Sequence, residues 1–198
     1  QGTCKRLFTY TDITVNDGDS LLLYLRAYWN GNKTDSVCLF NQFDQKIANS
    51  DSLKVLGANK SVVYIPFDSL AYIFSFYNNL ANPLLGIQDT SIYLHKLRIT
   101  PSYQILQKNQ RILRRRLASS LTACKHANGK DWWILVHGHG NNQFYRILAT
   151  PYGIEQVDSQ SIGPAFIFGF GPMSSLIVNP QGTKLVALSR DGNLNFYD

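Results

Sequence analysis

The sequence predicts an all-β fold, and more specifically a β-propeller built of WD-repeat-like blades of antiparallel strands. Apolar runs of about four to eight residues stop repeatedly at Gly, Asn, Asp or Pro, which is the pattern of strands separated by turns. Aromatic residues make up 13% of the 198 residues and charged residues only 16%, a balance more typical of β proteins than of helical ones. A unit of three or four strands also recurs along the chain, which favours blades over a sandwich.

The first half of the chain contains strand patterns up to residue 99. Turn residues at Asn30-Gly31-Asn32, at Asp68-Ser69 and at positions 83–86 separate neighbouring apolar runs. The predicted strands cover residues 6–11, 20–29, 36–43, 61–67, 71–77 and 91–99.

Residues 100–119 are predicted to form a basic connector, a loop with at most a short strand, because Pro101 and scattered polar side chains interrupt any period. The formal net charge of the chain is +6. Five positive charges lie in this connector, those of Lys108, Arg111, Arg114, Arg115 and Arg116. Such a local cluster is typical of a solvated linker or a partner-docking patch, and no nucleic-acid recognition motif accompanies it. We therefore expect no nucleic-acid partner.

Strand patterns resume after the connector and contain the repeat. Gly182 follows Gly129 by 53 positions, and each glycine ends a turn between an apolar strand and a very apolar middle strand. A second Gly turn and an aromatic strand follow in both copies, and the region around Asp68 is a looser third copy. The predicted strands cover residues 119–126, 131–138, 143–150, 154–160, 174–180, 184–190 and 194–198.

We expect residues 1–198 to form a single propeller segment of about three to four blades. A propeller closes only when its last blade meets its first, typically with about four to eight blades. The chain is therefore interpreted as a partial propeller or a fragment of a longer one. In an alternative arrangement, the strand at residues 6–11 completes the blade of residues 194–198 as its outer strand.

The stretch between Cys124 and Leu148 contains three of the four histidines, which raises the question of a metal site. His137 and His139 have a spacing that suits zinc, but a site also needs a third or fourth ligand and an orienting second shell. Because a Gly-x-Gly frame marks a turn more often than a site, we expect a hairpin end that tolerates solvent, with no metal or cofactor. Strand alternation places Trp132 and Trp133 on opposite faces, one packed between blades and one on a sheet face where it can stack on sugar.

Catalysis is not indicated either. Cys124 and His126 would share one strand face without a recognisable acid or oxyanion frame, and no nucleophile elbow or phosphate-cradling loop is present. We therefore expect no enzymatic activity. The alternative is a glycan-active propeller enzyme that uses acidic loop residues such as Asp89, Asp158 or Asp191.

Residues 163–173 are apolar but broken by glycines and prolines, so they are too interrupted for a membrane-spanning helix. We interpret them as a buried inter-blade loop. The alternative is an aromatic loop, with Phe168 and Phe170, that grips a partner. No other apolar run approaches the ~20 residues of a membrane helix, so no transmembrane segment is predicted.

The chain has three cysteines, Cys4, Cys38 and Cys124. Because they are odd in number and widely spaced, they indicate neither a disulfide framework nor a metal knuckle, although two of them could form one disulfide. No signal peptide is present, yet the chain starts at Gln1 rather than Met. Both a processed secreted protein and a trimmed fragment fit that start.

Over most of its length, and most strongly from Leu117 onward, the chain resembles a family of secreted proteins from Bacteroidetes-type bacteria. These proteins carry a propeller-like region ahead of a gliding-motility-associated or type IX secretion sorting domain, and no such domain is found among these residues. The family pattern runs as a His-x-Asn-Gly turn, a strand with two adjacent aromatic residues, an Asn before an aromatic-Tyr strand, a Gly turn, an Ile-Gly pair and a turn similar to SPDGKKLA. The matching positions are His126, Asn128, Gly129, Trp132, Trp133, Asn142, Phe144, Tyr145, Gly153, Ile162, Gly163 and residues 179–184.

The resemblance implies export to the cell surface. It also implies O-glycosylation at Asp-Ser-aliphatic triplets, with Ser20, Ser36, Ser52 and Ser69 as acceptors. Ordinary surface turns explain such short triplets equally well. Taken together, the sequence predicts a non-catalytic, extracytoplasmic propeller module, secreted or associated with the outer membrane. It would bind a protein or glycan partner or act as a scaffold in a surface assembly, with the remaining blades in the same chain or in a partner subunit.

Overall fold

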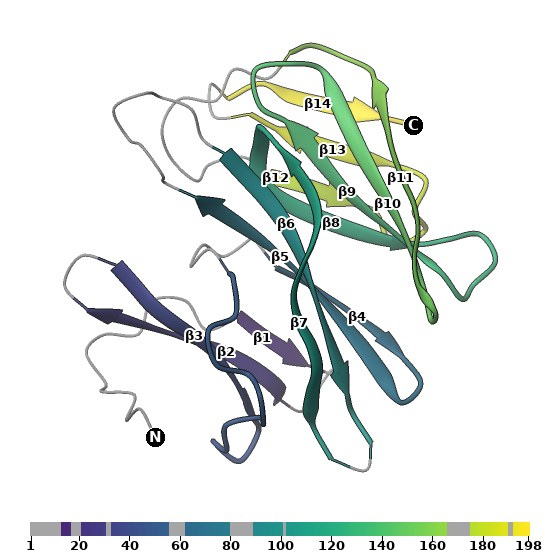
Figure 1. Cartoon of the computed structure of the whole chain (residues 1–198). Helices are drawn as coiled ribbons and strands as arrows, with labels where there is room; N and C mark the ends of the chain where they lie inside the picture. The colour runs from purple at the N-terminus through teal and green to yellow at the C-terminus, as the bar shows by residue number, and fades with distance from the viewer. Residues whose placement is uncertain are drawn as a thin grey trace. The chain divides into compact units, whose positions relative to one another are not determined.

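The computed structural model describes residues 13–16, 21–30, 33–55, 62–79, 89–100, 102–165, 175–189 and 192–198. Within these ranges the protein is all-β, because its regular elements are strands that form antiparallel sheets (Figure 1). The all-β prediction is thereby confirmed. No helix in the described ranges has the length and apolar character that crossing a membrane requires.

The described strands form four sheets, and within each sheet every strand lies beside its neighbour in sequence. The first sheet contains β1 (Ile13–Asn16), β2 (Leu21–Asn30) and β3 (Lys33–Asn41). The second contains β4 (Val62–Phe67), β5 (Leu70–Asn79), β6 (Asp89–Arg98) and β7 (Gln104–Arg115). The third contains β8 (Leu117–Lys125), β9 (Trp132–Gly138), β10 (Gln143–Thr150) and β11 (Gly153–Ser161). The fourth contains β12 (Ser175–Val178), β13 (Leu185–Leu188) and β14 (Leu194–Tyr197).

The loop prediction for the connector is wrong, because residues 104–115 form the twelve-residue strand β7. Only Ile105 and Leu113 are buried in this strand, so it lacks the apolar alternation by which strands are detected. Its place at the edge of the second sheet explains this composition, since charged side chains on an edge strand oppose pairing with other chains. Asn109, within this strand, has a positive φ of 58°.

The chain divides into two compact units, one of residues 1–77 and 93–111 and the other of residues 78–92 and 112–198. The predicted single propeller segment stays a prediction. The predicted strand at residues 6–11 lies outside the described residues, as does Cys4.

The first unit is built around alternating apolar side chains of β2 and β3. Leu25 pairs with Leu39, and these side chains join residues of β5, β6 and β7 in one buried cluster. Burial of such a cluster is the main favourable term in folding. The opposite face of the same strands carries Tyr24 and Phe40, whose stacked rings lie 5.4 Å apart. The cluster consists of Leu23, Leu25, Val37, Leu39, Ile47, Leu53, Val55, Ala71, Ile73, Leu97 and Ile105.

The repeat seen in the sequence has a structural counterpart in the second unit. The turn from β8 to β9 and the turn from β12 to β13 contain glycines with the same φ of 71°. In both turns the glycine N–H donates to the carbonyl of the residue three positions earlier, at 2.9 Å. That earlier residue, His126 or Asn179, donates its own N–H across the turn to Asp131 or Lys184, also at 2.9 Å. The two hairpins therefore have equivalent positions that can be compared one by one.

Candidate binding site

Two sheets of the second unit pack face to face and form the body of the site. Phe144 of β10, Leu176 of β12 and Ala187 of β13 make one buried cluster. The Tyr197 ring packs edge-on against Phe144 with centroids 5.1 Å apart. The N–H of Leu176 donates to Ser120 Oγ of β8 at 3.0 Å, which joins the two sheets by a hydrogen bond. The fourth sheet is therefore fixed against one face of the third.

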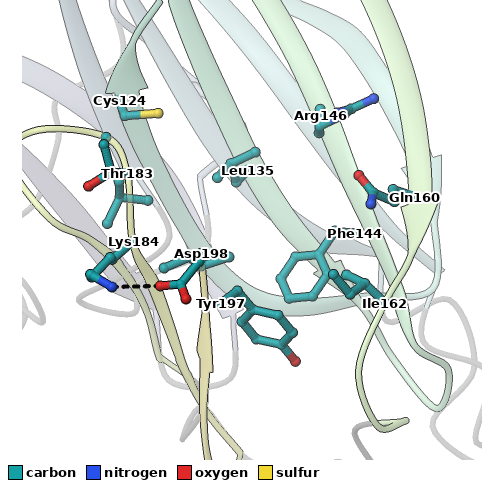
Figure 2. Close-up of a pocket in the computed structure, with 13 residues that line it drawn as sticks. Cys124, Leu135, Phe144, Arg146, Gln160, Ile162, Thr183, Lys184, Tyr197 and Asp198 are labelled. Atoms are coloured by element: carbon teal, nitrogen blue, oxygen red, sulfur yellow. Dashed lines mark hydrogen bonds and ion pairs between the residues drawn. The ribbon is translucent and has the colours of Figure 1, made fainter.

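A cleft of about 320 Å³ lies between these two sheets. Figure 2 shows the rings of Phe144 and Tyr197 next to each other, with Lys184 and Asp198 on one side and Gln160 on the other. The walls of the cleft combine apolar side chains with amide, hydroxyl, thiol and charged groups. The lining residues are Cys124, Leu135, Phe144, Arg146, Gln160, Ile162, Val178, Gly182, Thr183, Lys184, Leu185, Tyr197 and Asp198.

The third sheet supplies a row of polar groups beside the cleft. Pairing of β10 with β11 sets Arg146 opposite Asp158 and Phe144 opposite Gln160, and directly paired residues share a face. Arg146 Nε and Nη2 donate to the two Asp158 oxygens at 2.7 and 3.0 Å. Gln156 Nε2 donates to the same carboxylate at 2.5 Å. The side chains of Arg146, Asp158 and Gln156 are thereby held together by hydrogen bonds on one face of the sheet.

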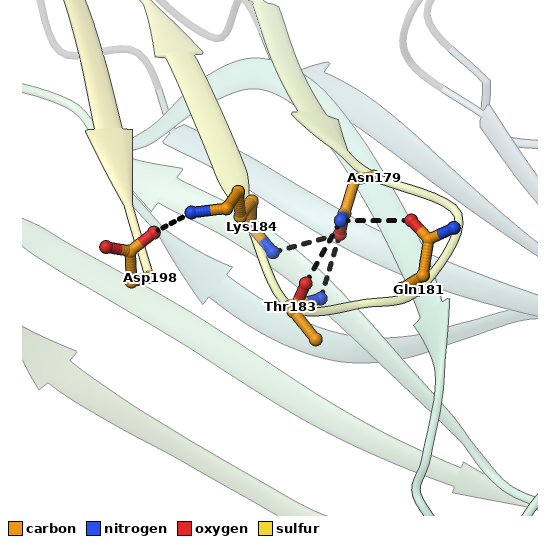
Figure 3. A network of polar contacts seen from close by, with 5 residues as sticks. All are labelled: Asn179, Gln181, Thr183, Lys184 and Asp198. Atoms are coloured by element: carbon orange, nitrogen blue, oxygen red, sulfur yellow. Dashed lines mark hydrogen bonds and ion pairs between the residues drawn. The ribbon is translucent and has the colours of Figure 1, made fainter.

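A second ion pair lies on the fourth sheet. Lys184 Nζ contacts Asp198 Oδ1 at 2.6 Å, and this hydrogen bond lowers the pKa of the Asp198 carboxyl (Figure 3). The turn before Lys184 is held by Asn179, whose Oδ1 accepts from the N–H groups of Thr183 and Lys184 at 2.8 and 2.9 Å. Its amide nitrogen donates to Gln181 and Thr183 side chains. The position of Lys184 is thus set by a side chain five residues away.

The tryptophans lie on opposite faces of β9, as the alternation predicts. Trp133 has the guanidinium carbon of Arg146 5.9 Å from its ring centroid and the His126 ring at 5.7 Å. Trp132 has Lys125 Nζ at 5.6 Å on the other face. Trp133 is therefore the aromatic side chain that shares a face with the polar row.

The histidines do not match the predicted solvent-tolerant hairpin end. His137 is 1% exposed, because it lies opposite Phe144 on the face of the third sheet that packs against the fourth, and its ring is edge-on to Phe144 at 4.4 Å. Burial lowers its pKa. His139 is partly buried, and its pKa is lowered by burial and by Arg116. Among the described residues, no group of three or more His, Cys, Asp or Glu side chains is placed to hold a metal ion.

The predicted basic residues lie on β7 and just after it. Arg111, Arg114, Arg115 and Arg116 are all exposed. Arg115 Nη1 donates to the Arg114 carbonyl at 2.9 Å. None of these four residues lines the cleft. The proposed docking role of this cluster stays a prediction.

Several other predicted site residues are placed only in part. Ser52 and Ser69 are exposed, whereas Phe168, Phe170, Asp191 and Ser20 lie outside the described residues. The side chains of Ser36 and Asp89 lie outside the description as well. Cys38 is buried and Cys124 half-buried, and no disulfide joins these two described cysteines. Burial raises the pKa of the Cys124 thiol.

His95 is the histidine that sequence reasoning did not single out, and the first unit buries it completely. Its Nδ1 accepts from the Asn109 N–H at 3.1 Å, so its proton is on Nε2, which lies 2.8 Å from Ser75 Oγ. Ser75 Oγ in turn donates to the Lys54 carbonyl at 2.7 Å. A serine beside a histidine resembles a nucleophile and its base, but both side chains are 0% exposed and no substrate can reach them. No motif surrounds His95 in the sequence, so only the apolar run in which it lies could have indicated its burial.

No protein-family model matches the chain, and a comparison with curated proteins gives no significant match. Its function therefore has to be argued from the arrangement of its own residues.

Proposed function

We propose that the chain is a non-catalytic, extracytoplasmic β-propeller module that binds a protein or glycan partner or builds part of a surface assembly. Propeller blades are small antiparallel sheets whose strands follow one another in chain order. The four described sheets have this topology. The equivalent turns at Gly129 and Gly182 support the view that the third and fourth sheets are copies of one repeat.

The single observation that carries the proposal is an exposed apolar face on the fourth sheet. Pairing puts Ile177, Val186 and Phe196 in one row and Leu188 beside Leu194 in another. These two rows face away from the cluster that packs on Phe144. Four of the side chains are strongly exposed: Ile177 59%, Leu188 38%, Leu194 52% and Phe196 72%. Contiguous exposed apolar side chains of this kind mark interaction surfaces.

The preceding repeat indicates what such a face contacts. When Gly129 is matched to Gly182, Ile177 corresponds to Cys124 and Leu188 to Leu135. Cys124 and Leu135 line the cleft, where the fourth sheet covers them. A face covered by the next sheet in one repeat is thus open to solvent in the following repeat. A further blade, from the same polypeptide or from a partner subunit, would cover it.

Residues from Leu117 onward also support the proposed location at the cell surface, because they carry the resemblance to the type IX secretion-associated family. The enzyme alternative has a weaker basis at Asp158, since Arg146 and Gln156 already donate to its carboxylate. A general acid or base needs a carboxyl group that is available to the substrate.

A crystal structure of this protein would test the propeller. Successive sheets related by a constant rotation about one common axis are expected, and sheets without a common axis would overturn the proposal. Assays of sugar release from neutral polysaccharides would test the non-catalytic part. Turnover that disappears in the Asp158→Asn variant would establish the enzyme alternative instead.

A further inference from the structure

We infer that the cleft between the third and fourth sheets binds a neutral sugar unit of a glycan. This inference rests on the proposed function, and it specifies the ligand class for the described cleft. It depends on three properties of the site, namely its fixed planar polar groups, its aromatic rings and its balanced charge.

The polar groups are arranged for hydroxyl groups. Arg146 uses Nε and one Nη2 hydrogen toward Asp158, so the guanidinium retains donors for another partner. The Arg146 side chain is 41% exposed, so a ligand can reach these donors. Gln160 adds an amide that both donates and accepts. Because sugar hydroxyls both donate and accept, adjacent hydroxyls on a ring suit such paired planar groups.

The aromatic groups provide an apolar surface in the same place. Tyr197 lies at the middle of the cleft with Phe144, which is 5% exposed, packed against its ring, and Leu135, Ile162 and Leu185 add further apolar lining. Aromatic rings bury large apolar areas with a defined geometry. The C–H faces of a pyranose ring are apolar and flat enough to contact the Tyr197 ring, whereas its hydroxyls point outward toward the polar row.

The charges at the cleft indicate that the ligand is neutral. Arg146 is paired with Asp158, and Lys184 with Asp198. An anionic or cationic ligand would have to compete with one member of an existing pair, which costs binding free energy. A neutral hydroxylated ligand can use the remaining donors and acceptors while both pairs stay intact. A volume of about 320 Å³ is at the small end of ligand pockets, which suits one ring with its neighbours outside.

The test is saturation-transfer NMR of the whole chain with the methyl glycosides of glucose, galactose, mannose and N-acetylglucosamine at millimolar concentration. Methyl glucuronate serves as the charged comparison. We expect transfer to at least one neutral glycoside and weaker transfer to the uronate. Absence of transfer to all four neutral glycosides, or a preference for the uronate, overturns the inference.

Variants of residues on β11 test whether the glycoside binds in the cleft. Gln160→Ala is expected to weaken binding about tenfold, because it removes hydrogen bonds to the ligand. Asp158→Asn is expected to weaken binding by a similar factor, because it removes the charged partner that orients the Arg146 guanidinium. Ser159→Ala is the matched control, since Ser159 is also exposed on β11 but faces the opposite side of the sheet. Equal binding by Gln160→Ala and Ser159→Ala would contradict the cleft as the site. A negative result leaves the propeller proposal intact, because that proposal depends on the sheet topology and on the exposed apolar face of the fourth sheet, not on the cleft.

Discussion

Buried His95 makes the stability of the first unit depend on pH. The ring accepts from the Asn109 N–H and lies within hydrogen-bond distance of Ser75 Oγ, so it fits its surroundings only as a neutral group. Burial, helped by the nearby Lys108 ammonium, lowers the pKa of His95 to about 4. In the unfolded chain the same imidazole has a pKa of about 6.5.

The direction of the effect follows from these two values. Above about pH 6.5 His95 is neutral in both states, and its contribution to the free energy of unfolding is fully present. As pH falls toward about 4, the unfolded chain binds a proton that the folded chain does not bind, so the folded state loses stability. The difference between the two pKa values corresponds to a loss of about 3 kcal/mol. That is a large share of the ~5–15 kcal/mol by which domains are stable.

The measurement is urea denaturation of the wild-type chain and of a His95→Gln variant at a series of pH values from about 7 to about 4.5. Glutamine keeps one acceptor and one donor but does not titrate. The free energy of unfolding of the wild type should fall more steeply than that of the variant, approaching the ~3 kcal/mol difference. His137 and His139 titrate in both proteins, so their contributions cancel in the comparison. Parallel curves for the two proteins would refute the reasoning.

Four further predictions concern the second unit. Gly129→Ala should cost about 1–2 kcal/mol, because its φ of 71° strains other residues although nothing lies near the added methyl group. Gly163→Ala should cost more, because the methyl group would also overlap the ring and hydroxyl of Tyr197; equal melting temperatures would contradict this. Asn179→Ala should cost about 1 kcal/mol in chemical denaturation, since two backbone N–H groups lose their acceptor in an exposed turn. A double-mutant cycle on Arg146 and Asp158 should give a coupling energy of about 0.5–1 kcal/mol, and zero coupling would argue against the bidentate pair.

The sequence predicts the parts of this fold that depend on local pattern. Apolar runs ending at turn residues locate β2 to β6 and β8 to β14, and alternation assigns Trp132 and Trp133 to opposite faces. It does not locate β7, because an edge strand buries little and has no apolar period. The burial of His137 is also missed. It depends on the packing of the fourth sheet against the third, which no local pattern contains.

The polar groups beside the cleft depend on the register between β10 and β11, which no sequence motif marks. Thr150 pairs with Gly153 at the turn, and a regular ladder continued from there would set Arg146 opposite Val157. A bulge between Leu148 and Ala149 shifts the register by one residue, so Arg146 pairs with Asp158 instead. Because a shift of one residue exchanges the two faces of a strand, the bulge turns Asp158 and Gln160 toward the cleft and Val157 away from it. The amino-acid sequence of β11 alone is compatible with Arg146 opposite Val157 and with Arg146 opposite Asp158. The ligand chemistry proposed for the cleft therefore follows from the bulge as much as from the side chains.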